Sequence, residues 1–168
     1  MIQILSATIS DIPAIQAVAA RAWPHTFKDI LSDSQIAYMM QLMYSSESLK
    51  KQMEEDNHRF YLAKKEDKIV GYISIEHNYG NSRKTKIHKV YLLPEEQHKG
   101  IGKLLFSLAE EKAKAANDTA IFLNVNKNNV IAVAFYNRVG YSLIREEVID
   151  IGNGFVMDDF VFEKKLMC

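Results

Sequence analysis

The stretch Lys86–Phe106 constrains the fold most, because it predicts a strand, a tight turn and a helix in direct succession. Its apolar run Val90–Leu93 leads into Pro94, which cannot donate a hydrogen bond to a sheet and so marks the end of a strand. We expect a helix to begin at or near Gly100. Gly100 and Gly102 are separated by one residue and let backbone N–H groups approach a ligand without intervening side chains.

The turn Gln97-His98-Lys99-Gly100-Ile101-Gly102 is predicted to bind a phosphate or a pyrophosphate. N–H groups at a helix N-terminus are available as donors, and the positive end of the helix dipole favours an anion. A dinucleotide motif would need a third glycine where Leu105 stands, and a P-loop would need serine or threonine after Gly102-Lys103, where leucine stands. A helix start that binds nothing remains the alternative from these six residues alone.

Composition indicates one soluble globular domain with a sizeable core. The chain has 168 residues and a formal net charge of zero, so neither nucleic acid nor an anionic membrane is expected as the main partner. Cys168 is the only cysteine, so no intrachain disulfide is expected, and this fits a cytoplasmic protein. No metal site is expected, because the five histidines and one cysteine lack ligand spacing. Neither a signal peptide nor an apolar stretch of membrane-spanning length is predicted.

Hydrophobic periodicity predicts an alternation of strands and helices along the whole chain. A first helix is expected to end at Trp23-Pro24, because the residue before proline is pushed out of the helical region. The order of elements predicts a mixed sheet covered by helices in a single α/β domain. The expected strands are Ile2–Ala7, Arg59–Lys65, Lys68–His77, the central strand before Pro94, Ala120–Val125, Tyr141–Ile151 and Phe155–Leu166. The other expected helices are Asp33–Tyr44, Ser46–Asp56, Gly100–Asn117 and Asn129–Gly140.

The motif Q-x-x-G-x-G after a strand that ends in proline resembles the acyl-CoA loop of the GNAT N-acetyltransferases. A second constellation resembles the second GNAT motif, N-x-x-A-x-x-x-Y-x-x-x-G-[FY], and comprises Leu123-Asn124-Val125, Asn129, Ala132, Ala134, Phe135-Tyr136 and Gly140-Tyr141. Within this family the chain is similar to the bacterial PaiA-type spermidine/spermine N-acetyltransferases. The resemblance implies one GNAT domain over residues 1–168, with a mixed, mostly antiparallel (α+β) sheet of about seven strands flanked by helices.

The resemblance also implies a binding site for acetyl-CoA. Backbone groups of Val90, Tyr91 and Leu92 would bind the pantetheine arm and the acetyl carbonyl, with the N–H near Leu92 as the oxyanion donor. Asn129 would lie beside the pantetheine. The pyrophosphate would be held by the turn and the residue after it, that is by Gln97, His98, Lys99, Gly100, Ile101, Gly102 and Lys103.

Acetyl transfer to an amine needs a neutral amine, a donor for the carbonyl oxygen and a proton or dipole for the departing thiolate. Tyr136 is the candidate general acid, because a phenol is protonated at neutral pH. The base is left open. Many relatives carry a glutamate where Lys86 stands, and an ammonium cannot accept a proton. His88, two residues further on the same strand face, is the candidate residue, and His25, Glu76 or a water chain are other routes.

The acceptor is predicted to be a primary amine on a small molecule such as a polyamine. Trp23, Phe27 and Tyr38 would form an aromatic wall able to hold a cationic chain. Two other functions stay open: acetylation of protein lysines or N-terminal amines, and a non-catalytic acetyl-CoA-binding regulator, which Lys86 favours and Tyr136 opposes. A homodimer is also left open.

Overall fold

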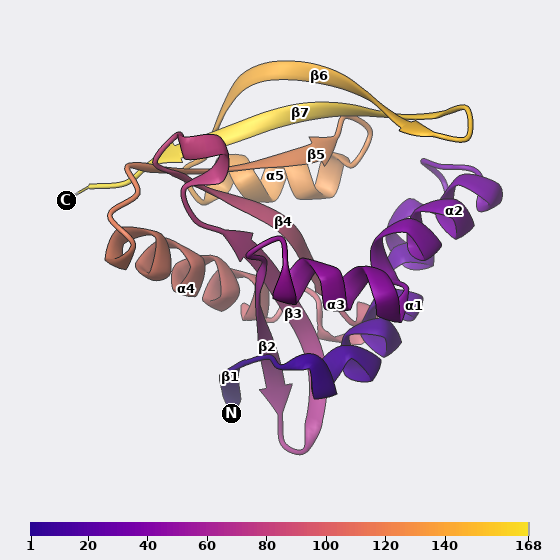
Figure 1. Cartoon of the computed structure of the whole chain (residues 1–168), viewed down its shortest axis with the longest axis horizontal. Helices are drawn as coiled ribbons and strands as arrows, with labels where there is room; N and C mark the ends of the chain where they lie inside the picture. Colours follow the sequence, from indigo (N-terminus) through magenta and orange to yellow (C-terminus); the bar gives the residue numbers. More distant parts are fainter. Residues whose placement is uncertain (168) are drawn as a thin grey trace. The chain divides into compact units, whose positions relative to one another are not determined.

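The computed structural model describes residues 1–167, so the prediction about Cys168 lies outside the described residues. Within the described residues, seven strands and five longer helices follow one another in the order that the sequence predicted (Figure 1). The strands are β1 Ile2–Ser6, β2 Arg59–Lys65, β3 Lys68–Glu76, β4 Lys84–Leu92, β5 Ala120–Asn126, β6 Ser142–Gly152 and β7 Phe155–Lys165. The helices are α1 Ile12–Phe27, α2 Asp33–Tyr44, α3 Ser46–Glu54, α4 Ile101–Ala115 and α5 Val130–Arg138, with short 3-10 turns at Ile9–Asp11, Tyr79–Asn81 and Pro94–Glu96.

The seven strands follow the order β1-β2-β3-β4-β5-β7-β6. The pairs β1–β2, β2–β3, β5–β7 and β6–β7 are antiparallel, whereas β4 and β5 run parallel. A parallel pair needs a crossover connection, and α4 supplies it between β4 and β5. The expected mixed, mostly antiparallel sheet of seven strands is therefore confirmed.

The chain divides into two compact units. Unit one comprises Met1–Glu76 and His88–Ala109, and unit two comprises His77–Ile87 and the chain from Glu110 onward. Strand β4 and helix α4 each contribute residues to both units. The expectation of one domain over the whole chain stays a prediction.

Unit one is built around α1 and the β2–β3 hairpin. Residues of α1 at helical spacing are buried, as are most residues of both hairpin strands. The turn between β2 and β3 lies at Glu66-Asp67, as predicted, with Glu66 at a φ of 57°. This packing positions the end of β4, which the predicted loop of residues 97–102 follows.

The prediction that α1 ends at Trp23-Pro24 is wrong, because the helix continues to Phe27. The N–H of Lys28 donates to the carbonyl of Pro24 at 3.0 Å and closes the last turn. Trp23 is only 1% exposed, and its ring centroid lies 4.7 Å from that of Phe27. Burial of this aromatic pair outweighs the local preference of a residue that precedes proline.

Unit two contains β5, α5 and the long β6–β7 hairpin, drawn in orange and yellow in Figure 1. The hairpin turns through Gly152, Asn153 and Gly154, all at positive φ, as turn chemistry requires. Asn129 caps α5, because its side chain accepts a hydrogen bond from the N–H of Ala132 at 3.3 Å. These bounds lie close to the predicted ones.

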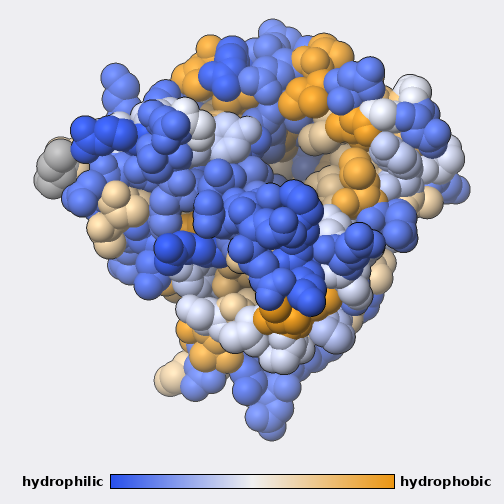
Figure 2. All heavy atoms as spheres, in the orientation of Figure 1, coloured by the Kyte–Doolittle hydropathy of each residue, from blue (hydrophilic) through white to orange (hydrophobic). Residues whose placement is uncertain are grey.

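Figure 2 shows a face on which hydrophilic residues predominate and hydrophobic residues gather in small groups. Among the helices within residues 1–167, none combines the length and the apolar character that crossing a membrane requires.

Candidate functional site

The predicted loop lies in unit one, between the end of β4 and the start of α4. Pro94–Glu96 form a 3-10 turn, Gln97 is extended, and α4 begins at Ile101, one residue after Gly100. His98 and Gly100 have φ values of 64° and 85°. Glycine adopts this region readily, whereas histidine does so uncommonly, so His98 marks local strain in the loop.

The loop presents backbone donors at the start of α4. The first N–H groups of a helix have no acceptor inside it, and here they belong to Ile101, Gly102 and Lys103. The side chain of Ile101 is buried and anchors the turn, while Lys99 and Lys103 are exposed. The arrangement can therefore donate to an anion, and the binding of a phosphate or pyrophosphate at this turn stays a prediction.

Ion pairs of Glu95 and Glu96 that the sequence did not reveal hold the turn before the loop. Arg21 donates two hydrogen bonds to the Glu95 carboxylate, at 2.9 and 2.7 Å, and this holds the pKa of Glu95 at about 2. The Glu96 carboxylate lies 3.1 Å from Lys65 Nζ and 3.5 Å from Lys99 Nζ, and both cations lower its pKa. Lys99 is therefore already shared with a carboxylate.

The predicted cofactor strand Val90–Leu92 runs close to β3. The N–H of Leu93 donates to the carbonyl of Val70 at 2.9 Å. A Cβ atom on Gly71 would lie 2.3 Å from Leu92 Cδ2 and 3.0 Å from the Tyr91 carbonyl oxygen. Only glycine allows this approach of the two strands without displacement.

The structure brings two of the three predicted acceptor residues against Tyr91 on β4. The Tyr91 ring centroid lies 5.5 Å from that of Trp23 and 6.4 Å from that of Phe27. Both Trp23 and Phe27 are buried in the core of unit one, whereas Tyr38 on α2 is half-buried. Trp23 Nε1 donates to Tyr44 Oη at 3.2 Å, so a buried polar group supports this cluster.

His88 lies beside two residues that come from other parts of unit one. Its Nε2 is 3.0 Å from Glu76 Oε1, and His58 Nε2 is 3.5 Å from the same oxygen. The two imidazole rings are stacked, with centroids 3.9 Å apart and planes 14° apart. Glu76 ends β3 and His58 precedes β2, so the sequence offered no spacing from which this trio could have been found.

Tyr136, the candidate acid, lies in α5 of unit two and is 8% exposed. Its ring lies 6.3 Å from Tyr141 and 6.1 Å from Phe162, centroid to centroid. Burial raises the pKa of its phenol, so the hydroxyl stays protonated at neutral pH. The side chain thus packs as a core residue and also keeps a proton.

Lys86 lies in the half of β4 that belongs to unit two. Its ammonium is 4.8 Å from the ring centroid of Tyr79 and 6.0 Å from that of Phe122, which are cation–π distances. The aromatic partners account for a cation at this position of the strand.

An acidic pair on the hairpin of unit two escaped the sequence analysis. Asn124 Nδ2 donates to Glu147 Oε2 at 3.0 Å and to Asp159 Oδ2 at 3.4 Å. Burial raises the pKa of Asp159, while the hydrogen bond from Asn124 and then that from Arg145 lower the pKa of Glu147. The register of β5, β6 and β7 brings these residues together, although they are distant in sequence.

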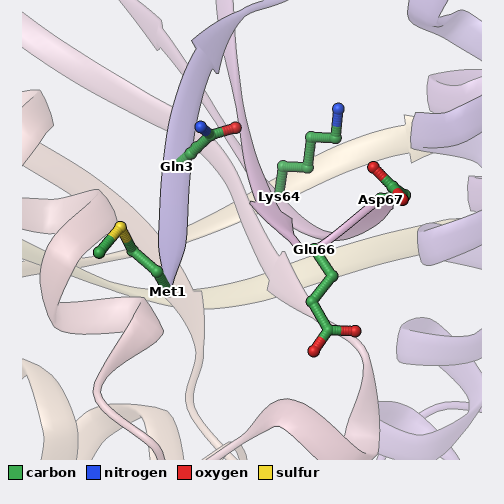
Figure 3. Close-up of a pocket in the computed structure, with 5 residues that line it drawn as sticks. All are labelled: Met1, Gln3, Lys64, Glu66 and Asp67. Carbon is green, nitrogen blue, oxygen red and sulfur yellow. The ribbon is translucent and has the colours of Figure 1, made fainter.

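A surface pocket lies elsewhere in unit one, at the edge formed by β1 and β2. It is lined by Met1, Gln3, Lys64, Glu66 and Asp67. Figure 3 shows that the Lys64 and Glu66 side chains point away from each other. None of the predicted site residues lines this pocket, so it adds nothing to the candidate site.

Comparison with a family model places most of the chain in one group. The model of the acetyltransferase (GNAT) family matches residues 17–141. That match includes both motifs singled out in the sequence, the loop before α4 and the segment from β5 to Tyr141.

Several curated relatives and solved structures match over almost the full length. A spermidine N(1)-acetyltransferase of Thermoplasma acidophilum is 27% identical, over 98% of this chain and 97% of the relative. A protein of Lactobacillus delbrueckii subsp. lactis described as an uncharacterized N-acetyltransferase is 25% identical, over 99% of this chain and 98% of the relative. The crystal structure of the PaiA N-acetyltransferase of Thermoplasma acidophilum in complex with coenzyme A has a TM-score of 0.82 at 27% identity, and the match covers 98% of this chain and 99% of that one.

Proposed function

The chain belongs to the acetyltransferase (GNAT) family and is an N-acetyltransferase that uses acetyl-CoA, and from this premise we propose that its acceptor is a primary amine of a small polycation such as spermidine. The observation that carries the proposal is the 27% identity, over nearly the full length, to a protein named a spermidine N(1)-acetyltransferase.

The loop before α4 would hold the pyrophosphate of acetyl-CoA. Backbone N–H groups at the start of α4 would donate to it, with Lys103 adding positive charge. The N–H near Leu92 would donate to the acetyl carbonyl, and Asn129 would lie beside the pantetheine. The solved relative in complex with coenzyme A supports this cofactor for the shared fold.

The reaction would then balance as follows. An ammonium acceptor loses one proton and becomes a neutral amine, whose nitrogen forms a bond to the acetyl carbon while the carbon–sulfur bond breaks. The nitrogen loses a second proton as the amide forms, and the sulfur gains one to give the thiol, so one proton is released in total. Tyr136 would donate toward the departing sulfur, since its buried phenol keeps its hydrogen.

Carboxylates in unit two suit a cationic acceptor. Glu147 and Asp159 are bridged by Asn124, and the β6–β7 strands carry further acidic residues. Of the predicted aromatic wall, Tyr38 stays the candidate for direct contact, because Trp23 and Phe27 are buried behind Tyr91. Those two would shape the strand and would not touch the acceptor.

An acceptor panel tests the proposal. Thiol release from acetyl-CoA is followed with spermidine, spermine, a lysine peptide and a peptide with a free N-terminal alanine, and mass spectrometry identifies each product. We expect kcat/KM for spermidine to exceed that for either peptide by about tenfold or more, in keeping with the specificity and faster association that charge complementarity adds. A peptide preference would favour protein acetylation. If calorimetry shows that acetyl-CoA binds but no amine causes thiol release, the non-catalytic acetyl-CoA-binding regulator would be favoured.

A further inference from the structure

The trio of His58, Glu76 and His88 in unit one is a cluster of titratable groups in which the candidate base His88 contacts two residues from other strands or loops. It first resembles a metal site, because two imidazoles and a carboxylate present donor atoms within 4.8 Å of one another. Stacked rings, however, keep their in-plane lone pairs in two nearly parallel planes, 14° apart in angle, that lie one above the other. A tetrahedral cation needs lone pairs that converge on one point. The arrangement therefore suits a proton better than a metal.

We propose that His88 accepts the proton that the acceptor amine loses, and that Glu76 and His58 are positioning residues that hold the His88 ring for this step. The inference rests on the proposed function and deepens it, because it names the base that acetyl transfer to an amine requires. His88 is half-buried and stands on the strand that carries Val90–Leu92. Residues two apart on a strand share a face, so His88 and Val90 face the same side of β4, with Cα atoms about 7 Å apart.

Glu76 fixes which nitrogen of His88 can work. When Nε2 carries the hydrogen, it donates to Glu76 Oε1 across 3.0 Å, and Nδ1 then carries the lone pair that takes the proton. The carboxylate also stabilises the imidazolium that forms. A carboxylate that orients a histidine in this way recurs in enzymes that use histidine as a base.

His58 restricts the trio to one extra proton. Its ring stacks on His88, and its Nε2 lies 3.5 Å from the same carboxylate oxygen. Two stacked imidazolium rings would repel, so the pair is expected to take up protons in two separate steps. The proton that His88 accepts thus gives one imidazolium beside one carboxylate, which is a neutral trio.

Charged groups on the surrounding elements bear on this titration. Asp56 precedes His58, and its carboxylate pairs with Lys51 Nζ at 2.8 Å. Lys89 follows His88 on β4, but its ammonium donates to Gln52 Oε1 at 2.7 Å. Lys86 stands two residues before His88 on the strand. The variants below leave all four of these groups in place.

The decisive experiment compares pH profiles of kcat/KM for wild type, His88→Gln, Glu76→Gln and His25→Gln, with spermidine as the acceptor. We expect His88→Gln to lower kcat by about 10²-fold or more and to remove the acidic limb of the profile. In Glu76→Gln the limb should move to lower pH by about one unit, because the imidazolium loses its carboxylate. His25→Gln tests the competing route through His25, an exposed histidine on α1, and the proposal requires that the acidic limb persist in this variant.

A second measurement does not depend on turnover. Imidazole NMR signals of the unliganded protein should titrate in two steps for His58 and His88 in wild type. In His58→Phe, which keeps an aromatic ring at the stack, His88 should titrate in a single step. Glu76→Gln should shift its midpoint downward, and unchanged acetyl-CoA binding would confirm that each variant is folded.

The outcomes separate the two claims. If the wild type releases thiol but His88→Gln stays within about threefold of it, or the limb disappears in His25→Gln instead, the proposed base is wrong. An unshifted limb in Glu76→Gln would refute the positioning role. A wild type that acetylates no amine would overturn the proposed function itself, and with it the role given to His88.

Discussion

Gly71 on β3 and Leu92 on β4 are so close that a Cβ atom on Gly71 would lie 2.3 Å from Leu92 Cδ2. The Tyr91 carbonyl oxygen would be 3.0 Å away from the same Cβ. Leu92 belongs to the strand proposed to hold the acetyl group. The position of that strand therefore depends on the absence of a side chain at residue 71.

Gly71→Ala should displace Leu92 and lower the free energy of unfolding by about 1–3 kcal/mol, the usual cost of overpacking. Acetyl-CoA should also bind less tightly. Gly154→Ala is the control, since Gly154 has a φ of 79° in open space and is costly through backbone strain alone. Urea unfolding and calorimetry measure both effects. Equal losses of acetyl-CoA affinity in the two variants would contradict the proposed role of the strand.

The Arg21–Glu95 pair predicts a pH dependence of stability. A carboxyl whose pKa is lower in the folded state contributes stability above its unfolded pKa, and this is lost as the pH falls through the folded value. For Glu95 that interval runs from its ordinary 4.5 down to about 2. The urea midpoint of wild type should exceed that of Arg21→Gln at pH 7, and the difference should shrink between pH 4.5 and pH 3. Arg59→Gln, at another exposed arginine, should show no such convergence.

The sequence predicted those parts of the fold and site that depend on local chemistry. Pro94 ends a strand and Gly100 precedes a helix for reasons that lie within a few residues, so the loop was found with its bounds. The end of α1 was missed because burial of Trp23 is a tertiary effect. Arg21 meets Glu95, and His88 meets His58, only once distant elements have packed. No spacing in the chain records such contacts.

Tyr136→Phe should lower kcat by about 10²-fold while acetyl-CoA binding stays within about twofold of wild type. Phenylalanine keeps the packing against Tyr141 and Phe162 but cannot donate to a departing sulfur. Tyr141→Phe is the matched control, because Tyr141 is also a buried phenol, donating to Glu110 Oε2 at 3.4 Å. Steady-state kinetics and calorimetry provide the comparison. Turnover that is unchanged in Tyr136→Phe, or equally reduced in both variants, would remove the acid assignment.

Phenylalanine substitutions at Tyr44 and Tyr72, two buried tyrosines of unit one, should lower the free energy of unfolding by unequal amounts. Tyr44 Oη accepts hydrogen bonds from Trp23 Nε1 at 3.2 Å and from Tyr72 Oη at 2.6 Å. Tyr44→Phe removes the acceptor of two buried donors and should cost about 1–3 kcal/mol for each. Tyr72→Phe removes one hydrogen bond and should cost about 1 kcal/mol. Urea unfolding distinguishes them, and equal losses would contradict the donor assignment.

Removal of the Glu96 carboxylate should increase the affinity for acetyl-CoA. The carboxylate lies 3.5 Å from Lys99 Nζ and beside the loop proposed to hold a pyrophosphate, so it competes for Lys99 and repels the ligand. Glu96→Gln should tighten acetyl-CoA binding about two- to fivefold at low salt, since ion pairs near the surface contribute a few tenths of a kcal/mol to about one.

The gain from Glu96→Gln should fade as salt screens the charges, and it should be smaller when Lys99→Gln is combined with it. Lys65→Gln serves as the control, because it removes the other cation beside Glu96 at 3.1 Å and leaves Lys99 in place. Calorimetric titrations of the single and double variants at two salt concentrations give the coupling between Glu96 and Lys99. If neither Glu96→Gln nor Lys99→Gln changes the affinity for acetyl-CoA, the pyrophosphate is bound elsewhere than at this loop.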